Sequence, residues 1–416
     1  MTAEVAVINK SAVAIASDSA VTIELIDSSG RINDKIYNTA NKLFSLSKYA
    51  PIGIMVYNTM ELGGVPWETI IKEYRKHIVD TKFDHLEQYA DNFFDYLCGN
   101  TNLFPEKQIQ NVLLKAIVRY FVSISATIKS NRTAKQIFDK EIAALDKLEY
   151  AESFSESNIQ LPQEYISQID AAANMVFKKS LIRNLKTKYR KLATLAIIKE
   201  EQLSGYTGVV ITGFGERDVF PKLIEYKTDL ILLNKVRKKK IKEYIPEGFD
   251  AGKVLSFAQE DITRTILDGI NPSYAQAILN SAVRFIANLP DKIIDDIVEL
   301  DAAKKGLYKK SATLASMDAI KEFFLRMDKE RVEKHTFQIE NAIQMMPFSE
   351  LAEIAELFIK LTQVRRRLSP DSETVGGPID VAVISKADGF VWIKRKFYFD
   401  KNLNYSFYGN YFDATN

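Results

Sequence analysis

A threonine follows the initiator residue, and two short apolar segments follow the threonine. Residues 3–8 alternate an Ala-Val-Val face with a Glu-Ala-Ile face, which is typical of a β-strand. Residues 9–11 (Asn-Lys-Ser) have the composition of a turn, and residues 12–16 form a second small apolar segment. An antiparallel hairpin of these two strands returns Asp18 to the level of Thr2. The sequence therefore predicts that the two side chains lie close together.

A third segment places a cation near this pair. Lys42, Phe44 and Leu46 recur at every second position, as expected for a strand. Such a strand can present Lys42 beside both Thr2 and Asp18.

These three residue types suit one kind of catalysis. If Met1 is removed, Thr2 carries a free α-amino group, which titrates near ~8 and can accept the proton of its own hydroxyl. A nearby cation keeps that amine neutral at working pH, and a carboxylate holds the cation. Lys42 and Asp18 are the candidates for these two roles.

The order of these motifs resembles one protein family. Residues 16–22 (ASDSAVT) match an "A-x-D-S-x-x-T" stretch, and residues 42–44 (KLF) match a later "K-L-F". Both are features of the proteasome β subunit and the related bacterial ATP-dependent protease core, which are N-terminal nucleophile (Ntn) hydrolases. The resemblance implies that Thr2, Asp18 and Lys42 are catalytic.

The resemblance also implies an oxyanion donor. Family members use the backbone N–H of a glycine that ends the strand after the lysine, since glycine allows the chain to turn there. Asn58 stands nearest that position, and asparagine tolerates a positive φ better than most residues. We therefore expect the Asn58 N–H to face the oxyanion.

Two later blocks extend the resemblance to roughly half of the chain. Residues 207–228 read as strand, turn and strand, and an amphipathic helix over about residues 349–366 leads to a glycine pair and a closing strand at residues 375–384. These blocks are similar to the family's later hairpin and to its C-terminal end.

The chain departs from the family around the glycine pair. The family has a serine before the first glycine and an aspartate a few residues earlier. Here Val375 precedes Gly376, and Asp371 and Glu373 are each one place out of register. Ser17, Asp371, Glu373 and Gly376 are therefore only accessory candidates.

These departures keep two alternatives open. One is a catalytically inactive, proteasome-like scaffold or interaction subunit, which the valine at position 375 favours. The other is an amidase that acts on a small non-peptide amide, because a fold does not fix the substrate. The leading hypothesis remains a threonine-type peptidase.

Composition restricts the other function classes. The single Cys98 excludes an internal disulfide and a cysteine-rich zinc site, and His77, His85 and His335 form no ligand cluster, so we expect neither metal nor cofactor. The net charge is +2, and the six cations of residues 235–242 are typical of a lysine-guarded strand edge rather than of a nucleic-acid site.

Hydropathy and the resemblance together suggest the location and the partners. No apolar run is long enough to cross a membrane, and no signal-like segment is apparent, so we expect a cytoplasmic protein with no membrane partner. The expected partners are a peptide or protein substrate and further copies of the chain in a homo-oligomer. An ATPase partner is left open.

The predicted fold class is α+β: a four-layer αββα Ntn-hydrolase sandwich with an additional helical subdomain. We assign the core to residues 1–60, 206–270 and 347–416. Residues 61–205 supply sheet-covering helices and a helical insertion, and residues 271–346 supply a second helical insertion. Within them, Pro105 is expected to open a helix, and prolines at positions 272 and 290 to punctuate the second insertion.

Overall fold

The computed structural model describes residues 2–26, 32–128, 130–154, 160–200, 203, 205–248, 251–297, 301–369, 375–400 and 403–404. Helices and antiparallel strands are mixed along the chain, so the predicted α+β class is confirmed. The strands are β1 (Ala3–Ile8), β2 (Ala12–Ser17), β3 (Val21–Ile26), β4 (Ile32–Tyr37), β5 (Leu43–Ser45), β6 (Ile52–Asn58), β7 (Glu61–Leu62), β8 (Val65–Pro66), β9 (Thr207–Gly213), β10 (Lys222–Leu232), β11 (Lys235–Tyr244), β12 (Lys253–Ala258), β13 (Asp380–Ser385) and β14 (Gly389–Lys394).

The helices fall into four groups along the chain. They are α1 (Trp67–Ile78) and α2 (Leu86–Gly99); α3 (Glu106–Ser125), α4 (Asn131–Asp146), α5 (Gln163–Val176), α6 (Lys179–Asn184) and α7 (Lys186–Ile198); α8 (Asp261–Asp268), α9 (Pro272–Asp295), α10 (Ala302–Arg331) and α11 (Phe337–Gln344); and α12 (Phe348–Arg367). Short 3-10 and π segments lie at Glu152–Phe154 and Val332–Thr336.

Two five-stranded sheets form the centre of the molecule. Sheet I has the strand order β12-β1-β2-β13-β14, and sheet II has the order β11-β10-β9-β6-β5. All neighbouring strands in both sheets run antiparallel. Residues distant in sequence thus become neighbours, since the N-terminal strand β1 lies between β2 and β12.

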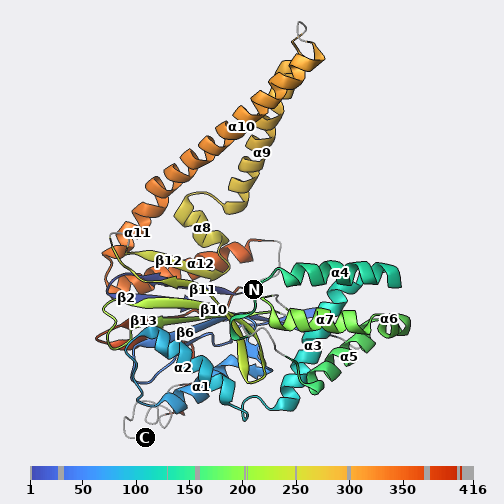
Figure 1. Ribbon diagram of the computed structural model, residues 1–416. Coiled ribbons are helices and arrows are strands. Elements are labelled where there is room, and N and C mark those ends of the chain that lie inside the picture. Colours follow the sequence, from blue (N-terminus) through green and yellow to red (C-terminus); the bar gives the residue numbers. More distant parts are fainter. Residues whose placement is uncertain are drawn as a thin grey trace.

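The sheets stack face to face, with helices on the outer faces (Figure 1). Every second residue of β1 points between the sheets, where Ala6 and Ile8 pack with Met55 and Val210 of sheet II. The alternate residues of β1 pack against α12. On the far side, α1 and α2 cover sheet II. The apolar alternation in the sequence therefore builds two different cores, one on each face of β1.

A glycine allows the sheets to approach closely. An ideal Cβ at Gly53 of β6 would lie 2.6 Å from the Cδ1 atom of Ile384 in β13. A side chain at this position would collide with the opposite sheet, so the absence of a Cβ is needed for this packing.

The first helical insertion forms a bundle beside the sheets. Pro105 precedes α3 as predicted, and the helix buries Leu113, Ile117 and Phe121 along one face. The helices α3 to α7 extend away from the end of the sheets where the N-terminus lies (Figure 1).

The second insertion forms an antiparallel helical hairpin that projects from the body (Figure 1). Asn271 caps α9 through its side chain, and Pro272 occupies the first helical turn, as expected. The expected break at Pro290 is wrong, because α9 continues through it to Asp295. A proline removes one intrahelical hydrogen bond, and the rest of this 24-residue helix retains its own.

Three further segments bear on the sequence predictions: the lysine-rich segment, the stretch before Lys42 and the parts of the chain that form the two sheets. The lysine-rich segment is the edge strand β11 of sheet II, as predicted. Between Asp18 and Lys42, β3 and β4 pair as a two-stranded ladder that the sequence analysis did not predict. The strands of the two large sheets come from residues 3–58, 207–258 and 380–394. The assignment of domain boundaries stays a prediction.

Candidate functional site

A row of polar side chains crosses sheet I at one end. Glu4 of β1 lies opposite Ser17 of β2, which in turn lies opposite Asp380 of β13. Their apolar neighbours two residues along each strand, such as Ala6 and Ile15, point between the sheets. By the two-residue period of a strand, the polar row also faces sheet II. The site therefore lies at one end of the sheet–sheet interface.

Lys42 meets this row from the opposite sheet. Its carbonyl oxygen accepts a hydrogen bond from Val56 N of β6, which ties it to sheet II. Its Nζ atom lies 2.5 Å from Asp18 Oδ1, and the Lys42 side chain is 0% exposed. Because an ammonium group is costly to bury without a counter-charge, this contact fixes both partners in place.

Asp18 is also held by the backbone. Its Oδ1 atom accepts a hydrogen bond from Ala3 N at 3.1 Å, and its Oδ2 atom accepts from Ala20 N at 3.2 Å and from Gly376 N at 3.0 Å. Gly376 and the end of β1 thus converge on one carboxylate. Three N–H donors and an ammonium satisfy its two oxygens.

Thr2 lies in the same cluster and is buried. Its hydroxyl donates a hydrogen bond to Glu4 Oε2 at 3.1 Å. The structure therefore brings Thr2, Asp18 and Lys42 together, with Glu4 between the threonine and the lysine.

Sequence reasoning missed Glu4. Its Oε1 atom lies 3.6 Å from Lys42 Nζ, and its side chain is fully buried. Burial raises the pKa of Glu4 to about 8, against the attraction of Lys42, and the neighbouring Asp18 raises it further. The signal in the sequence was a lone carboxylate in an otherwise apolar strand, two residues after the threonine.

Asn58 occupies the end of β6. It has a φ of 66°, the left-handed conformation expected for this position. The ring of Tyr57, the residue before Asn58, stacks on the ring of Phe257 with the ring centroids 6.0 Å apart. Ala258, the residue after Phe257, pairs with Ala3 at the start of β1. The end of β6 is thereby held near the start of β1, where Thr2 lies.

The remaining accessory candidates behave differently from one another. Gly376 contributes its N–H to Asp18, as described, whereas Val375 packs into the apolar core beneath sheet I. The Ser17 hydroxyl is buried and has no hydrogen-bond partner among the described residues. Asp371 and Glu373 lie outside the described residues, as does Met1.

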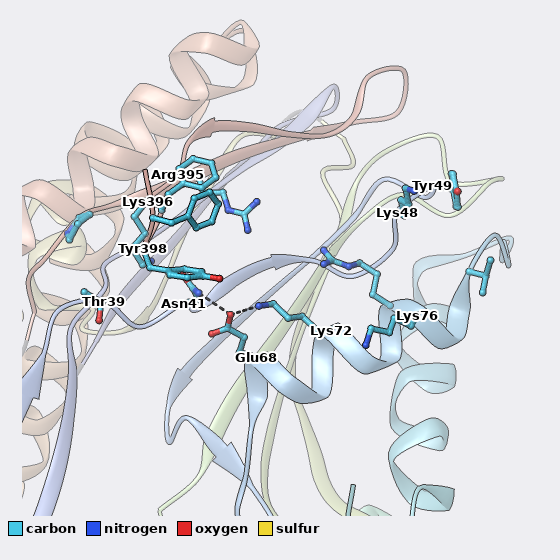
Figure 2. Close-up of a pocket in the computed structure, with 15 residues that line it drawn as sticks. Thr39, Asn41, Lys48, Tyr49, Glu68, Lys72, Lys76, Arg395, Lys396 and Tyr398 are labelled. Carbon is cyan, nitrogen blue, oxygen red and sulfur yellow. Dashed lines mark hydrogen bonds and ion pairs between the residues drawn. The ribbon is translucent and has the colours of Figure 1, made fainter. Parts of the chain in front are cut away.

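A large cavity, shown in Figure 2, is lined by residues that are neighbours of this cluster. It has a volume of about 1010 Å³, and Asn41, next in sequence to Lys42, lines it. Pro378 also lines it and accepts a hydrogen bond from Ser19, next to Asp18. Thr2 itself is not among the described residues that line the cavity. Lys42 and Asp18 are not among them either, so the cavity wall reaches the cluster only through neighbouring residues such as Asn41 and Pro378.

The cavity wall is basic. Glu68 is the one carboxylate among the described residues that line it, and it bonds to Lys72 and Asn41 (Figure 2). Lys396 pairs with Asp380, and burial together with the charge of Lys42 lowers its pKa. The cations that line the cavity are Lys48, Lys72, Arg75, Lys76, Arg395 and Lys396.

No family profile and no curated protein matches this chain. Among solved structures, the Gly-1 mutant of Anbu from Hyphomicrobium sp. strain MC1 is similar at 9% sequence identity, with a TM-score of 0.29 over 99% of this chain and 94% of that chain. A likeness of this size does not define the fold or the activity, so both are argued from the residues themselves.

Among the helices of the described residues, not one combines the length and apolarity needed to cross a membrane. The same part of the chain contains no group of three or more His, Cys, Asp or Glu side chains arranged to hold a metal ion.

The buried Lys42–Asp18 contact predicts a large stability loss on substitution. Lys42→Met leaves Asp18 and Glu4 buried without their cation, so we expect the free energy of unfolding to fall by about 3–5 kcal/mol. The matched control is Lys72→Met, because Lys72 and its partner Glu68 are half exposed and such pairs contribute less than about 1 kcal/mol. Urea unfolding of both variants measures the difference. Equal, small losses would contradict the burial of Lys42.

Proposed function

We propose that the chain is a proteasome-like N-terminal threonine hydrolase that cleaves amide bonds, most simply those of peptides. The observation that carries the proposal is the buried contact chain from the Thr2 hydroxyl through Glu4 and Lys42 to Asp18. A buried hydroxyl beside a cation and carboxylates is an arrangement in which a threonine can act as a nucleophile.

In this proposal Thr2 attacks the substrate carbonyl carbon after Met1 has been removed. Lys42 supplies positive charge beside the reacting centre, and Asp18 holds Lys42 in place. The N–H of Asn58 stabilises the oxyanion, which the left-handed backbone at this residue supports. The accessory hydroxyl that the family has before its glycine pair is absent, because Val375 is apolar.

The same proposal assigns the architecture. Residues 1–60, 206–270 and 347–416 form an αββα Ntn-hydrolase core, and residues 61–205 and 271–346 are additions to it. The layering of helices outside two stacked sheets supports this assignment.

The first prediction from the proposed function concerns the nucleophile. Thr2→Ala removes the attacking oxygen, so the cleavage rate of short fluorogenic peptides should fall by roughly 10³-fold or more. Thr313→Ala, on the projecting helix α10, is the control and should keep wild-type activity. Equal activity of Thr2→Ala and wild type would rule out the mechanism.

The second prediction concerns the substrate. Because six cations and one carboxylate line the cavity beside the site, it should accept an acidic side chain of the peptide. The double variant Lys72→Glu, Arg75→Glu should lower kcat/KM for acidic peptides by about tenfold, since each exposed pair contributes up to about 1 kcal/mol. Neutral peptides should be cleaved as before.

Lys321→Glu is the control for that measurement, since it makes the same kind of charge change on the exposed hairpin helix α10. If the double variant slows acidic and neutral peptides equally, the cavity does not select charge.

The third prediction concerns self-assembly, which we propose occurs through the helical hairpin. Phe285 of α9 is 68% exposed and Leu314 of α10 is 58% exposed, and large apolar side chains exposed in this way mark interaction surfaces. Light scattering of the wild-type protein should give the mass of an oligomer. The double variant Phe285→Asp, Leu314→Asp should have a smaller mass. The exposed Lys310→Asp is the control. A concentration-independent wild-type mass near 47.3 kDa would reject the prediction.

A further inference from the structure

Glu4 has no role in the mechanism that the sequence suggests, yet it makes the closest described contact with the candidate nucleophile. The Thr2 hydroxyl donates to Glu4 Oε2 at 3.1 Å. The other carboxylate oxygen, Oε1, faces Lys42 Nζ at 3.6 Å and has no hydrogen-bond partner among the described residues. Thus Oε2 of Glu4 accepts the hydrogen bond from the Thr2 hydroxyl, whereas Oε1 faces the Lys42 ammonium group.

We propose that Glu4 is the catalytic base that accepts the Thr2 hydroxyl proton and later delivers it to the leaving amine. The assignment rests on the proposed function, and it replaces the Thr2 α-amine in that role. Its basis is geometric, because a base must lie within hydrogen-bond reach of the proton it removes.

The charge of the cluster agrees with this role. Glu4, Asp18 and Lys42 are buried together, so two carboxylates face one ammonium group. When Glu4 is ionised, a free Thr2 α-ammonium group supplies a second positive charge after Met1 is removed. In that protonated form the amine cannot accept the hydroxyl proton, which leaves Glu4 to accept it.

The proton affinity of Glu4 also suits a base. Burial raises its pKa to about 8, and a carboxylate with a pKa near the working pH is a stronger base than an exposed one. The charged groups that face it are Lys42, which favours its ionised form, and Asp18, which disfavours it. Burial and a hydrogen bond to Glu225 raise the pKa of Tyr57 of β6, and the charge of Glu4 adds a smaller contribution in the same direction.

The chemical steps balance without a further reactant except water. The Oγ–H bond of Thr2 breaks, its proton passes to Glu4, and Oγ forms a bond to the carbonyl carbon. When the C–N bond breaks, the proton goes to the leaving amine and an ester on Thr2 remains. Glu4 then accepts a proton from water, the hydroxide forms the acid product, and the proton returns to Thr2 Oγ.

The test measures the rate at which a β-lactone acylates Thr2 in the full-length wild type and in variants of Glu4. Intact-mass spectrometry follows the reaction at several pH values from 6 to 9.5. Glu4→Gln keeps the size of the side chain but cannot accept the proton, so the rate should fall by roughly 10²–10⁴-fold. Glu4→Asp keeps a carboxylate that is one methylene shorter, and it should retain part of the rate and a pH dependence.

The matched control is Glu340→Gln. Glu340 of α11 is 8% exposed and pairs with Lys253 at 2.9 Å, so it is also a largely buried carboxylate with a lysine partner. Lys253 lies opposite Ile8, at the other end of β1 from Thr2. This variant should react like wild type.

The outcomes separate the two proposals. If wild type reacts and Glu4→Gln reacts within twofold of it, Glu4 is not the base, and the proposed function stands. If wild type itself does not react at any pH, the proposed function fails and the role of Glu4 fails with it. Should Glu4→Gln not fold, Glu4→Asp decides: an unchanged rate and pH midpoint overturn the proposal.

A second measurement tests the buried carboxyl without any reaction. Because the pKa of Glu4 is raised from 4.5 to about 8, folding favours its protonated form, and this stabilisation is lost as the pH rises through about 8. The urea midpoint of wild type should therefore fall between pH 5 and pH 9 relative to that of Glu4→Gln. Parallel curves would show that Glu4 is ionised throughout and too weak a base for this role.

Discussion

The contact between Lys42 and Asp18 joins the two sheets at the end where Thr2 and Glu4 lie. Lys42 is bonded to sheet II through its backbone, and Asp18 is bonded to β1 and to the segment before β13 through its carboxylate. Because both charges are buried, neither can be removed without exposing the other to an apolar environment. The pair therefore fixes the relative position of three distant parts of the chain, and Thr2 and Glu4 are held by the same arrangement.

This arrangement explains why a polar site can exist between two apolar sheets. The inward-facing residues change from Ile8 and Ala6 of β1 to Glu4 and then Thr2, just before the strand, so this face becomes polar toward the start of β1. Cations come from sheet II and from the segment after β14, where Lys396 pairs with Asp380. Further cations line the cavity, and their positive charge is the reason that we expect a preference for acidic peptides.

Much of this site follows from short-range patterns in the sequence. The hairpin of β1 and β2 and the position of Asp18 depend on local alternation and turn composition, and the positive φ of Asn58 depends on a local preference of asparagine. Glu4 could not be assigned in the same way, because its importance arises from Lys42, which belongs to the other sheet. The ladder of β3 and β4 and the continuation of α9 through Pro290 were also missed, since each depends on neighbouring segments more than on the residues themselves.

The central claim is that the Thr2 hydroxyl becomes covalently acylated during turnover. Reaction with a peptide substrate, quenched in acid within one turnover and analysed by mass spectrometry of the N-terminal fragment, tests it directly. We expect a fragment that begins at Thr2 and carries the acyl part of the peptide as an ester. A fragment that still begins with Met1 and carries no acyl group, while the peptide is cleaved, would contradict it.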